Sequence, residues 1–293
     1  MPAYDLYIPT DLPDALSYLD DYGETTSVIA RGTDLLPRIR RRQFPAVNLL
    51  DISGLEKELR YIRNEDGFFR VGALTRVADL LETPLLGKEL ELIREAGRKF
   101  GDPQIRNMAT VGGNVCSASS SEDLIPVFLA LDARVKLSSA KGDRSIHMKD
   151  FILGKRTVSR KNGEILSQVE FRSLPPNTGS GFEKMGRRNI LIIALVNEAL
   201  VLTMEDDRET IREARLALNR VAGRLPARAS ATEESLAGKR LTPETISAAQ
   251  GTLARELALK TDFRASGDYR LEIAKVYLKR LLELCAFRIR GGN

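Results

Sequence analysis

The chain is poor in the residues on which most metal and nucleophile sites depend. It has two cysteines and one histidine among 293 residues, and it has no tryptophan. Cys116 and Cys285 lie far apart, which argues against a disulfide framework, a zinc site or an iron–sulfur cluster of its own, since a cluster ordinarily takes four thiolates. His147 has no candidate nucleophile beside it, and we interpret it as an ordinary surface or strand residue. We therefore predict neither metal ligands nor catalytic residues in this chain.

Long apolar runs are also lacking. No stretch approaches the roughly 20 apolar residues that cross a bilayer, and the first residues lack the basic-then-apolar pattern of a secretory signal. A composition of 43% hydrophobic and 29% charged residues suits a globular protein, and the length allows two domains of ordinary size. We expect a cytoplasmic protein with no membrane span.

The charge balance is basic, with a formal net charge of +5 and a pI near 9.2. The densest run of arginines lies at positions 38 to 42, without helix-turn-helix or zinc-finger spacing and without interleaved aromatic residues. This pattern argues against a nucleic-acid partner. It favours solvated faces, with contact to acidic partner subunits or to a cofactor phosphate as the alternative.

The first half of the chain reads as two α/β units. Apolar periodicity predicts helices and strands in alternation up to residue 53, and then a hairpin followed by helices and two more strands. The predicted elements of the first unit are helix 14–22, strand 27–30, helix 34–42 and strand 47–51. Those of the second are strands 59–63 and 68–72 around an Asp-Gly turn, helices 75–81, 85–100 and 122–131, and strands 133–137 and 164–171.

The segment 173–181 contains two prolines and two glycines, which extend neither regular structure, and it is the clearest boundary in the sequence. A C-terminal domain follows it. Thr242 with Pro243 behind it marks one helix start by its capping pattern. The expected elements of this domain are strands 192–204 and 210–219 and helices 243–260 and 268–289.

Two glycine-bearing turns carry the strongest indication of function. Residues 109–123 are predicted to form a loop with paired glycines among hydroxyl side chains, leading into a helix. Residues 28–37 place a tight turn between a short apolar strand and a helix. Unpaired backbone N–H groups at such a turn can hold an anion. Because the two turns lie about eighty residues apart, they suit one diphosphate linker gripped from both sides. Neither has the G-x-G-x-x-G spacing of a Rossmann fingerprint.

At these residues the chain resembles the flavin-binding (medium) subunit of the molybdenum hydroxylases, the group that includes carbon monoxide, xanthine and nicotinate dehydrogenases. The resemblance covers nearly the whole length, from residues 7–9 through both turns and 101–110 to 164–166, 182–184 and 269–270. It implies an α+β fold, with a two-part FAD-binding α/β domain at 1–174 (subunits 1–53 and 54–174) and a smaller C-terminal domain of antiparallel strands and helices at 180–293.

The resemblance also implies how FAD would be held. The first phosphate cradle would comprise Ala30, Arg31, Gly32, Thr33, Asp34 and Leu35, and the second Thr110, Val111, Gly112, Gly113 and Asn114. Asp123 would meet the ribose or adenine end, although it could merely favour the start of a helix. Phe100 would lie beside the flavin or adenine, and Ile165 or Leu166 near the ring, unless they are core residues. Lys184 would lie near the pyrimidine end of the flavin, unless it is a solvated strand lysine.

Two departures from the family pattern bear on this prediction. Relatives usually have glycine where this chain has Arg31, and a side chain there costs about 1–2 kcal/mol if the position needs positive φ. Arg31 could offset this cost by pairing with the diphosphate, or it could indicate weakened FAD binding. The usual acidic residue after Lys184 is replaced within residues 189–194. The flavin-ring contacts are therefore less secure than the phosphate contacts.

The implied function is an electron-transfer subunit that carries FAD. A partner with [2Fe–2S] clusters would deliver electrons from a partner with a molybdenum cofactor, FAD here would pass them to an acceptor such as NAD, and the complex would be a dimer of heterotrimers. Two alternatives stay open. One is a self-contained flavin oxidoreductase, and the other is a scaffold subunit that has lost FAD.

Overall fold

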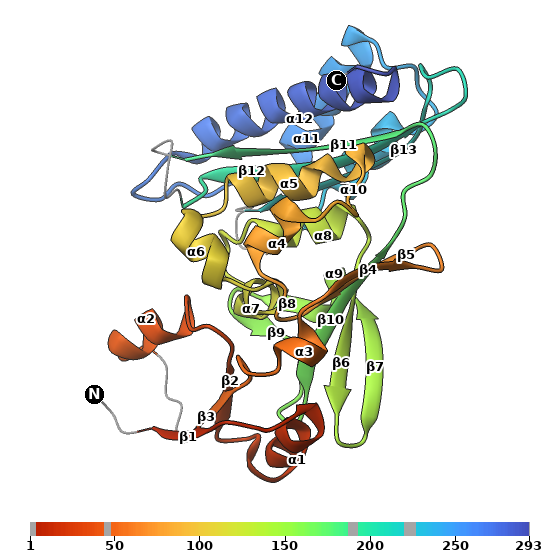
Figure 1. Ribbon diagram of the computed structural model, residues 1–293. Coiled ribbons are helices and arrows are strands. Elements are labelled where there is room, and N and C mark those ends of the chain that lie inside the picture. The colour runs from red at the N-terminus through yellow and green to blue at the C-terminus, as the bar shows by residue number, and fades with distance from the viewer. Residues whose placement is uncertain (1–3, 44–47, 187–192, 220–226, 293) are drawn as a thin grey trace.

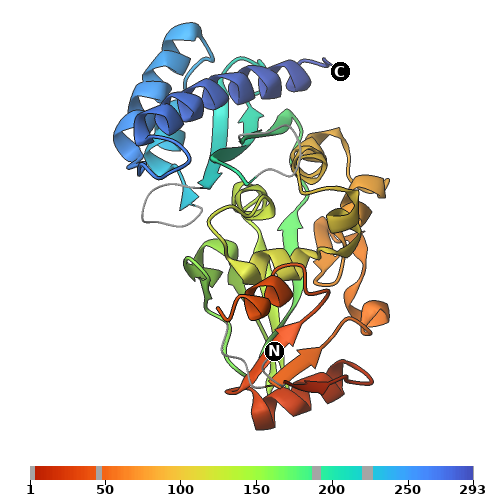
Figure 2. The same ribbon diagram turned by 90° about the vertical axis from the view of Figure 1, so that its left-hand side faces the viewer.

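The computed structural model describes residues 4–43, 48–186, 193–219 and 227–292. The chain builds three successive units, each around its own sheet, and the N- and C-terminal units lie at opposite ends of the molecule (Figure 1, Figure 2). None of the helices in these described ranges is long and apolar enough to cross a membrane.

The N-terminal unit is a parallel three-stranded sheet in the order β1-β3-β2, with two helices. Asp11 caps α1 by accepting a hydrogen bond from the backbone of Asp14, and α1 buries Ala15, Leu16 and Leu19 against the sheet. Every predicted element is present with shifted ends, although Val47 lies outside the described residues, and the short β1 is additional. The elements are β1 Asp5–Tyr7, α1 Leu12–Tyr22, β2 Thr26–Ile29, α2 Leu35–Arg40 and β3 Asn48–Asp51.

The middle unit is an antiparallel five-stranded sheet in the order β4-β5-β10-β6-β7. The predicted Asp-Gly turn joins its first two strands, with Asp66 at φ 54° and Gly67 at φ 74°. The prediction missed β7, which lies at the sheet edge. The strands are β4 Ile62–Glu65, β5 Phe68–Gly72, β6 Arg134–Ser139, β7 Gly142–His147 and β10 Ile165–Arg172.

The helices of the middle unit differ most from prediction. The single helix expected over 85–100 is a 3-10 turn followed by a shorter α-helix, and Gly87 before the turn has an extended backbone with φ −72° and ψ 176°. The segment after Thr110, expected as a loop, is itself a helix. The elements are α3 Glu56–Leu59, α4 Val77–Glu82, η1 Lys88–Leu90, α5 Glu91–Arg98, α6 Pro103–Met108, α7 Val111–Ser117, α8 Leu124–Ala130, α9 Met148–Phe151, β8 Ile152–Gly154 and β9 Thr157–Val158.

The C-terminal unit is an antiparallel sheet in the order β11-β12-β13-β14. The predicted boundary 173–181 is too long, because β11 begins at Thr178 and includes two of its glycines. A Cβ at Gly179 would meet the Cys285 carbonyl oxygen at 2.5 Å, so these glycines allow α12 to pack closely on the strand. The elements are β11 Thr178–Met185, β12 Val196–Met204, β13 Ile211–Asn219, β14 Ala227–Arg228, α10 Ser230–Leu236, α11 Pro243–Glu256 and α12 Gly267–Ile289.

The middle and C-terminal units are packed directly together. The long helix α12 packs on β11 and β12, while α5 and α8 of the middle unit cover the opposite face of the same sheet (Figure 1). Glu95 on α5 accepts a hydrogen bond from the backbone of Phe182 at 2.7 Å and pairs with Arg288 of α12 at 2.6 Å. These contacts fix the C-terminal sheet against the helices that follow β5.

Candidate functional site

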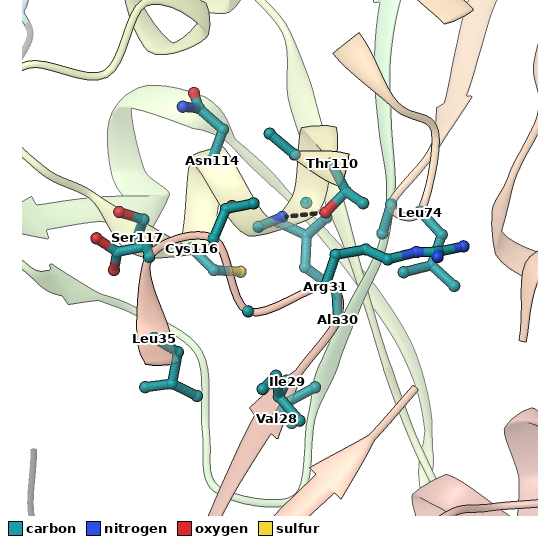
Figure 3. Close-up of a pocket in the computed structure, with 18 of the residues that line it drawn as sticks. Val28, Ile29, Ala30, Arg31, Leu35, Leu74, Thr110, Asn114, Cys116 and Ser117 are labelled. Carbon is teal, nitrogen blue, oxygen red and sulfur yellow. Dashed lines mark hydrogen bonds between the residues drawn. The ribbon is translucent and has the colours of Figure 1, made fainter. Parts of the chain in front are cut away.

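A cavity of about 500 Å³ lies between the N-terminal and middle units. It is lined by the turn between β2 and α2 and by α7 (Figure 3). The α5–α6 connection and the start of β10 complete the lining. Its volume falls within the range of small-molecule sites. Thirteen of the predicted site residues line it, namely Ala30, Arg31, Gly32, Thr33, Asp34, Leu35, Phe100, Thr110, Gly112, Gly113, Asn114, Ile165 and Leu166.

The first turn keeps its backbone donors available. Strand β2 ends at Ile29, and the chain reverses at Gly32 with φ 71° before α2 begins. Within the described residues, the backbone N–H groups of Gly32, Thr33 and Asp34 have no hydrogen-bond acceptor. Since these groups lie at a helix start on the cavity wall, they fit an anionic ligand.

The second turn is built differently from the prediction. Thr110 is the N-cap of α7, and its hydroxyl oxygen accepts the Gly113 N–H at 3.1 Å. The Gly112 N–H donates to the Ala73 carbonyl oxygen at 2.8 Å, and the Asn114 N–H donates to the Thr110 carbonyl oxygen at 2.9 Å. These amides are therefore occupied inside the protein, and the turn offers side-chain groups and a close backbone approach instead of free N–H groups.

Arg31 does not have the strained backbone that its replacement of glycine suggests. Its φ is not positive, and the left-handed residue of the turn is Gly32. The Arg31 guanidinium extends beside Leu74 (Figure 3) and forms an ion pair with Glu56. Glu56 also binds Arg76 at 2.6 Å, and the hydrogen bond from Arg76 is the largest cause that lowers the pKa of Glu56 to about 2. The expected strain is thus absent, and the charge of Arg31 is committed to Glu56.

An ion pair joins the first turn to α7. Arg156, in the β8–β9 turn, binds both carboxylate oxygens of Asp34, at 2.7 and 2.9 Å, and donates to the Ser117 hydroxyl at 2.6 Å. Pairing neutralises a carboxylate that would otherwise repel an anion in the cavity. The ion pair between Asp34 and Arg156, which we call the clasp, also holds the β2–α2 turn against the C-terminal end of α7.

The remaining wall is apolar. Phe100 follows α5, and Ile165 and Leu166 begin β10, as predicted for residues beside a ring system. Ile105 and Met108 of α6 continue this surface, and Met108 is largely exposed. The cavity therefore has a polar part at the two turns and an apolar part suited to an aromatic group.

Three predicted residues do not line this cavity. Val111 is buried in the core, and its N–H donates to the Thr75 carbonyl oxygen at 2.9 Å. Asp123 and Lys184 form a buried ion pair at 2.5 Å between α8 and β11. Asn197 donates a further hydrogen bond to Asp123 at 2.9 Å. A cofactor role for these three residues stays a prediction, and Lys184 is not the solvated lysine of the alternative. Residues 189–192 lie outside the described residues.

Sequence reasoning missed several lining residues, including Cys116, Ser117, Glu122, Arg156 and Arg160. Burial raises the pKa of the Cys116 thiol to about 11 and that of the Glu122 carboxyl to about 8. The prediction named Asp123 as a site residue and omitted Glu122, which directly precedes it. The arginines belong to the β8–β9 region, for which the sequence predicts no element, and Arg156 reaches the first turn only through a long-range ion pair with Asp34.

Comparison with known proteins gives matches over almost the whole chain. The family model "FAD binding domain in molybdopterin dehydrogenase" matches residues 2–173, and "CO dehydrogenase flavoprotein C-terminal domain" matches residues 180–284. The glyceraldehyde dehydrogenase medium chain of Sulfolobus acidocaldarius is 31% identical over 275 residues, which cover 94% of this chain and 95% of the relative. The nicotinate dehydrogenase FAD-subunit of Eubacterium barkeri is 29% identical over 100% of this chain and 99% of the relative.

Solved structures give the same result. A Cu,Mo-CO dehydrogenase structure contains a chain that superposes with a TM-score of 0.91 at 28% identity, covering 98% of this chain and 99% of that one. A chain of quinoline 2-oxidoreductase from Pseudomonas putida 86 superposes with a TM-score of 0.90 at 26% identity, covering 98% of each.

Proposed function

We propose that this chain, which belongs to the FAD-binding (medium) subunits of the molybdenum hydroxylases, transfers electrons within a larger complex. The predicted resemblance, the two-domain α+β fold and the cofactor FAD are thereby confirmed, and the chain is an oxidoreductase subunit. We propose that it accepts electrons from the [2Fe–2S] clusters of one partner and passes them to an acceptor such as NAD. A second partner would hold the molybdenum cofactor, in a cytoplasmic dimer of heterotrimers. We retain the domain limits 1–174 and 180–293.

The observation that carries this proposal is that the two glycine turns line one cavity with an apolar wall beside them. The free N–H groups of Gly32 and Thr33 and the hydroxyl of Thr110 would hold the FAD diphosphate. Phe100 and Leu166 offer apolar surface to a ring. Bound FAD would supply the exchange between single-electron carriers and a two-electron acceptor.

The side chains of the cavity favour this role over a self-contained flavin oxidoreductase. Its described lining includes no histidine, lysine or tyrosine, which are common proton-transfer groups. The Cys116 thiol, with a pKa of about 11, stays protonated at neutral pH. The two carboxyl groups of the lining are bonded within the protein, Asp34 to Arg156 and Glu122 to Ser117 and Asn114, which suits a chain whose substrate is oxidised elsewhere.

The alternative of a scaffold subunit that has lost FAD no longer has an observation in its favour. That alternative rested on Arg31, whose side chain in place of glycine could strain the turn and so indicate weakened FAD binding. The arginine backbone is unstrained, and its guanidinium pairs with Glu56.

The test is to purify the native complex through this chain and to measure its flavin, iron, acid-labile sulfide and molybdenum. The proposal expects all four, together with one FAD for each copy of this chain. The isolated chain, loaded with FAD, should show flavin absorbance near ~450 nm that NADH bleaches if NAD is the acceptor. An absence of iron–sulfur partners, or turnover of a small organic substrate by the isolated chain, would contradict the electron-transfer role.

A further inference from the structure

The side chain of Arg31 connects the first turn to the middle unit. Its guanidinium pairs with Glu56 of α3, and within the part of the chain that the structure describes it has no other hydrogen-bond or ion-pair partner. The oxygen that Arg31 binds, Oε1 of Glu56, also accepts a hydrogen bond from Arg76 at 2.6 Å. A single carboxylate oxygen therefore joins an arginine of the N-terminal unit to an arginine of the middle unit.

Arg76 is fixed directly beside the second turn. It is the N-cap of α4, and its backbone forms an antiparallel bridge with Thr110, the N-cap of α7. Next to this bridge, the Val77 N–H donates to the Ala109 carbonyl oxygen at 3.0 Å. The Arg76 side chain thus starts from a backbone that is bonded to the second turn.

The Glu56 carboxylate is also held from the middle unit by a second arginine. Arg60 donates to Glu56 Oε2 at 2.9 Å and binds both oxygens of Asp79, at 2.8 and 2.9 Å. Asp79 in turn accepts the backbone N–H of Arg76 at 2.8 Å. Glu56 therefore belongs to a network of the middle unit, and Arg31 is the member of this network that comes from the first turn.

The first turn is consequently attached on both sides of Gly32. Arg31, directly before Gly32, is bound by Glu56, and Asp34, two residues after it, is held by the clasp. Figure 3 shows that the Arg31 side chain extends away from Ser117, which also contacts the clasp, so the two attachments lie on different sides of the turn. One attachment would fix a distance, whereas two also fix the direction of the free N–H groups between them.

We propose that Glu56 is a positioning residue for FAD, which acts through Arg31 to hold the free N–H groups of the first turn toward the diphosphate. The inference rests on the placement of the diphosphate proposed above. Glu56 does not line the cavity, so its effect passes through the arginine that does. A binding loop that is already held in its bound conformation lowers the ordering cost of binding. Without Glu56 the turn keeps the clasp alone, and FAD has to order it.

The experiment is a double-mutant cycle on Glu56 and Arg31, with FAD affinity of the full-length apoprotein measured by flavin absorbance. Glu56→Gln and Arg31→Gln should each lower the affinity by about two- to fivefold, which is the range for one partly exposed ion pair. The double variant should lower it no further than either single variant, because both remove the same link. Arg31→Lys keeps a cation beside Glu56 and should retain most of the affinity.

The matched control is Glu58→Gln in the same helix. The Glu58 carboxylate also contacts the N-terminal unit, since it accepts the Leu12 N–H at 3.2 Å, but it does not bind the first turn. This variant should keep the FAD affinity of the natural chain. Should Glu56→Gln fail to fold, Glu56→Asp takes its place in the cycle, because it keeps the charge near Arg60 and shortens the reach toward Arg31.

Three results would overturn the role of Glu56. If the double variant binds FAD more weakly than Arg31→Gln, Glu56 acts on the fold through Arg60 and Arg76 and not through the first turn. If Glu56→Gln binds FAD more tightly and the double variant loses this gain, the freed Arg31 binds the diphosphate itself. Natural affinity in both single variants leaves the link without effect. Failure of the natural chain to bind FAD overturns instead the proposed site.

Discussion

Replacing Gly32 by alanine tests the first turn most directly. Gly32 has φ 71°, where an L-residue costs about 1–2 kcal/mol. The added Cβ would lie 2.6 Å from the end of the Leu36 side chain, which can rotate away, so the steric addition is small. We expect urea denaturation to show a loss of about 1–2 kcal/mol in the free energy of unfolding.

The same substitution should weaken FAD binding by more than this strain explains. Relaxing the turn reorients its free N–H groups, and one hydrogen bond to a charged group contributes about 1.5–3 kcal/mol. Since about 1.4 kcal/mol corresponds to a tenfold change, losing one such bond predicts affinity lower by about 10- to 100-fold in an FAD titration. The measurement uses flavin absorbance on the purified full-length chain.

The control is Gly67→Ala in the turn between β4 and β5. Gly67 has φ 74°, and an added Cβ there meets nothing within 4 Å, so the backbone cost matches without a contact to the cavity. This variant should lose similar stability and keep its FAD affinity. Equal loss of affinity in both variants, or natural affinity in Gly32→Ala, would refute the assignment of the diphosphate to this turn.

Three further substitutions test other parts of the structure. Gly112→Ala places a Cβ 2.9 Å from a backbone carbonyl oxygen and should lower the free energy of unfolding by about 1–3 kcal/mol. The control Gly251→Ala, in an open part of α11, should not lower it. Equal thermal stability of the two variants would contradict the close packing of α7. Lys184→Met leaves Asp123 buried without its cation and should cost about 3–5 kcal/mol in urea denaturation, and FAD loss without destabilisation would instead support the predicted flavin contact. Glu122 has a folded pKa of about 8, above its ordinary value, so its contribution to stability is present at low pH and is lost as pH rises toward 8. Glu122→Gln should therefore gain stability relative to the natural chain between about pH 5 and about pH 8. A stability difference that stays constant over this range would contradict the raised pKa.

The sequence predicts those parts of the fold whose signals are local. The Asp66–Gly67 turn, the capped start of α11 after Thr242 and the extent of α12 all follow from residues within one or two helical turns. Strand β1 escapes prediction because it is three residues long and largely exposed, and it is defined by pairing with β3. Helix α7 escapes because its two glycines lower helix propensity, by about 1 kcal/mol each relative to alanine, while packing on Ala73 requires a glycine.

The candidate site, like the fold, is predictable from the sequence where its signals are local. Glycines and hydroxyls at tight turns are readable in one sequence, and both turns indeed line the cavity. The partner of Asp123, Lys184, is 61 residues away on strand β11, so nothing local shows that the two side chains pair. Arg156 likewise reaches Asp34 across 122 residues of sequence. Long-range ion pairs decide which polar residues remain available to a ligand, and a single sequence does not contain that information.

The two turns look alike in sequence but differ in what they offer a phosphate group. The amides of α7 are bonded to the backbone after β5 and to Thr110, so the second turn is held rigidly in place. The amides at Gly32 are free, and the clasp between Asp34 and Arg156 connects that turn to α7. The hydrogen-bond donors for an anion therefore reside mainly in the first turn, and the second fixes its distance and supplies hydroxyls. Loss of the clasp should consequently affect FAD binding through the position of the first turn, while the fold of α7 remains unchanged.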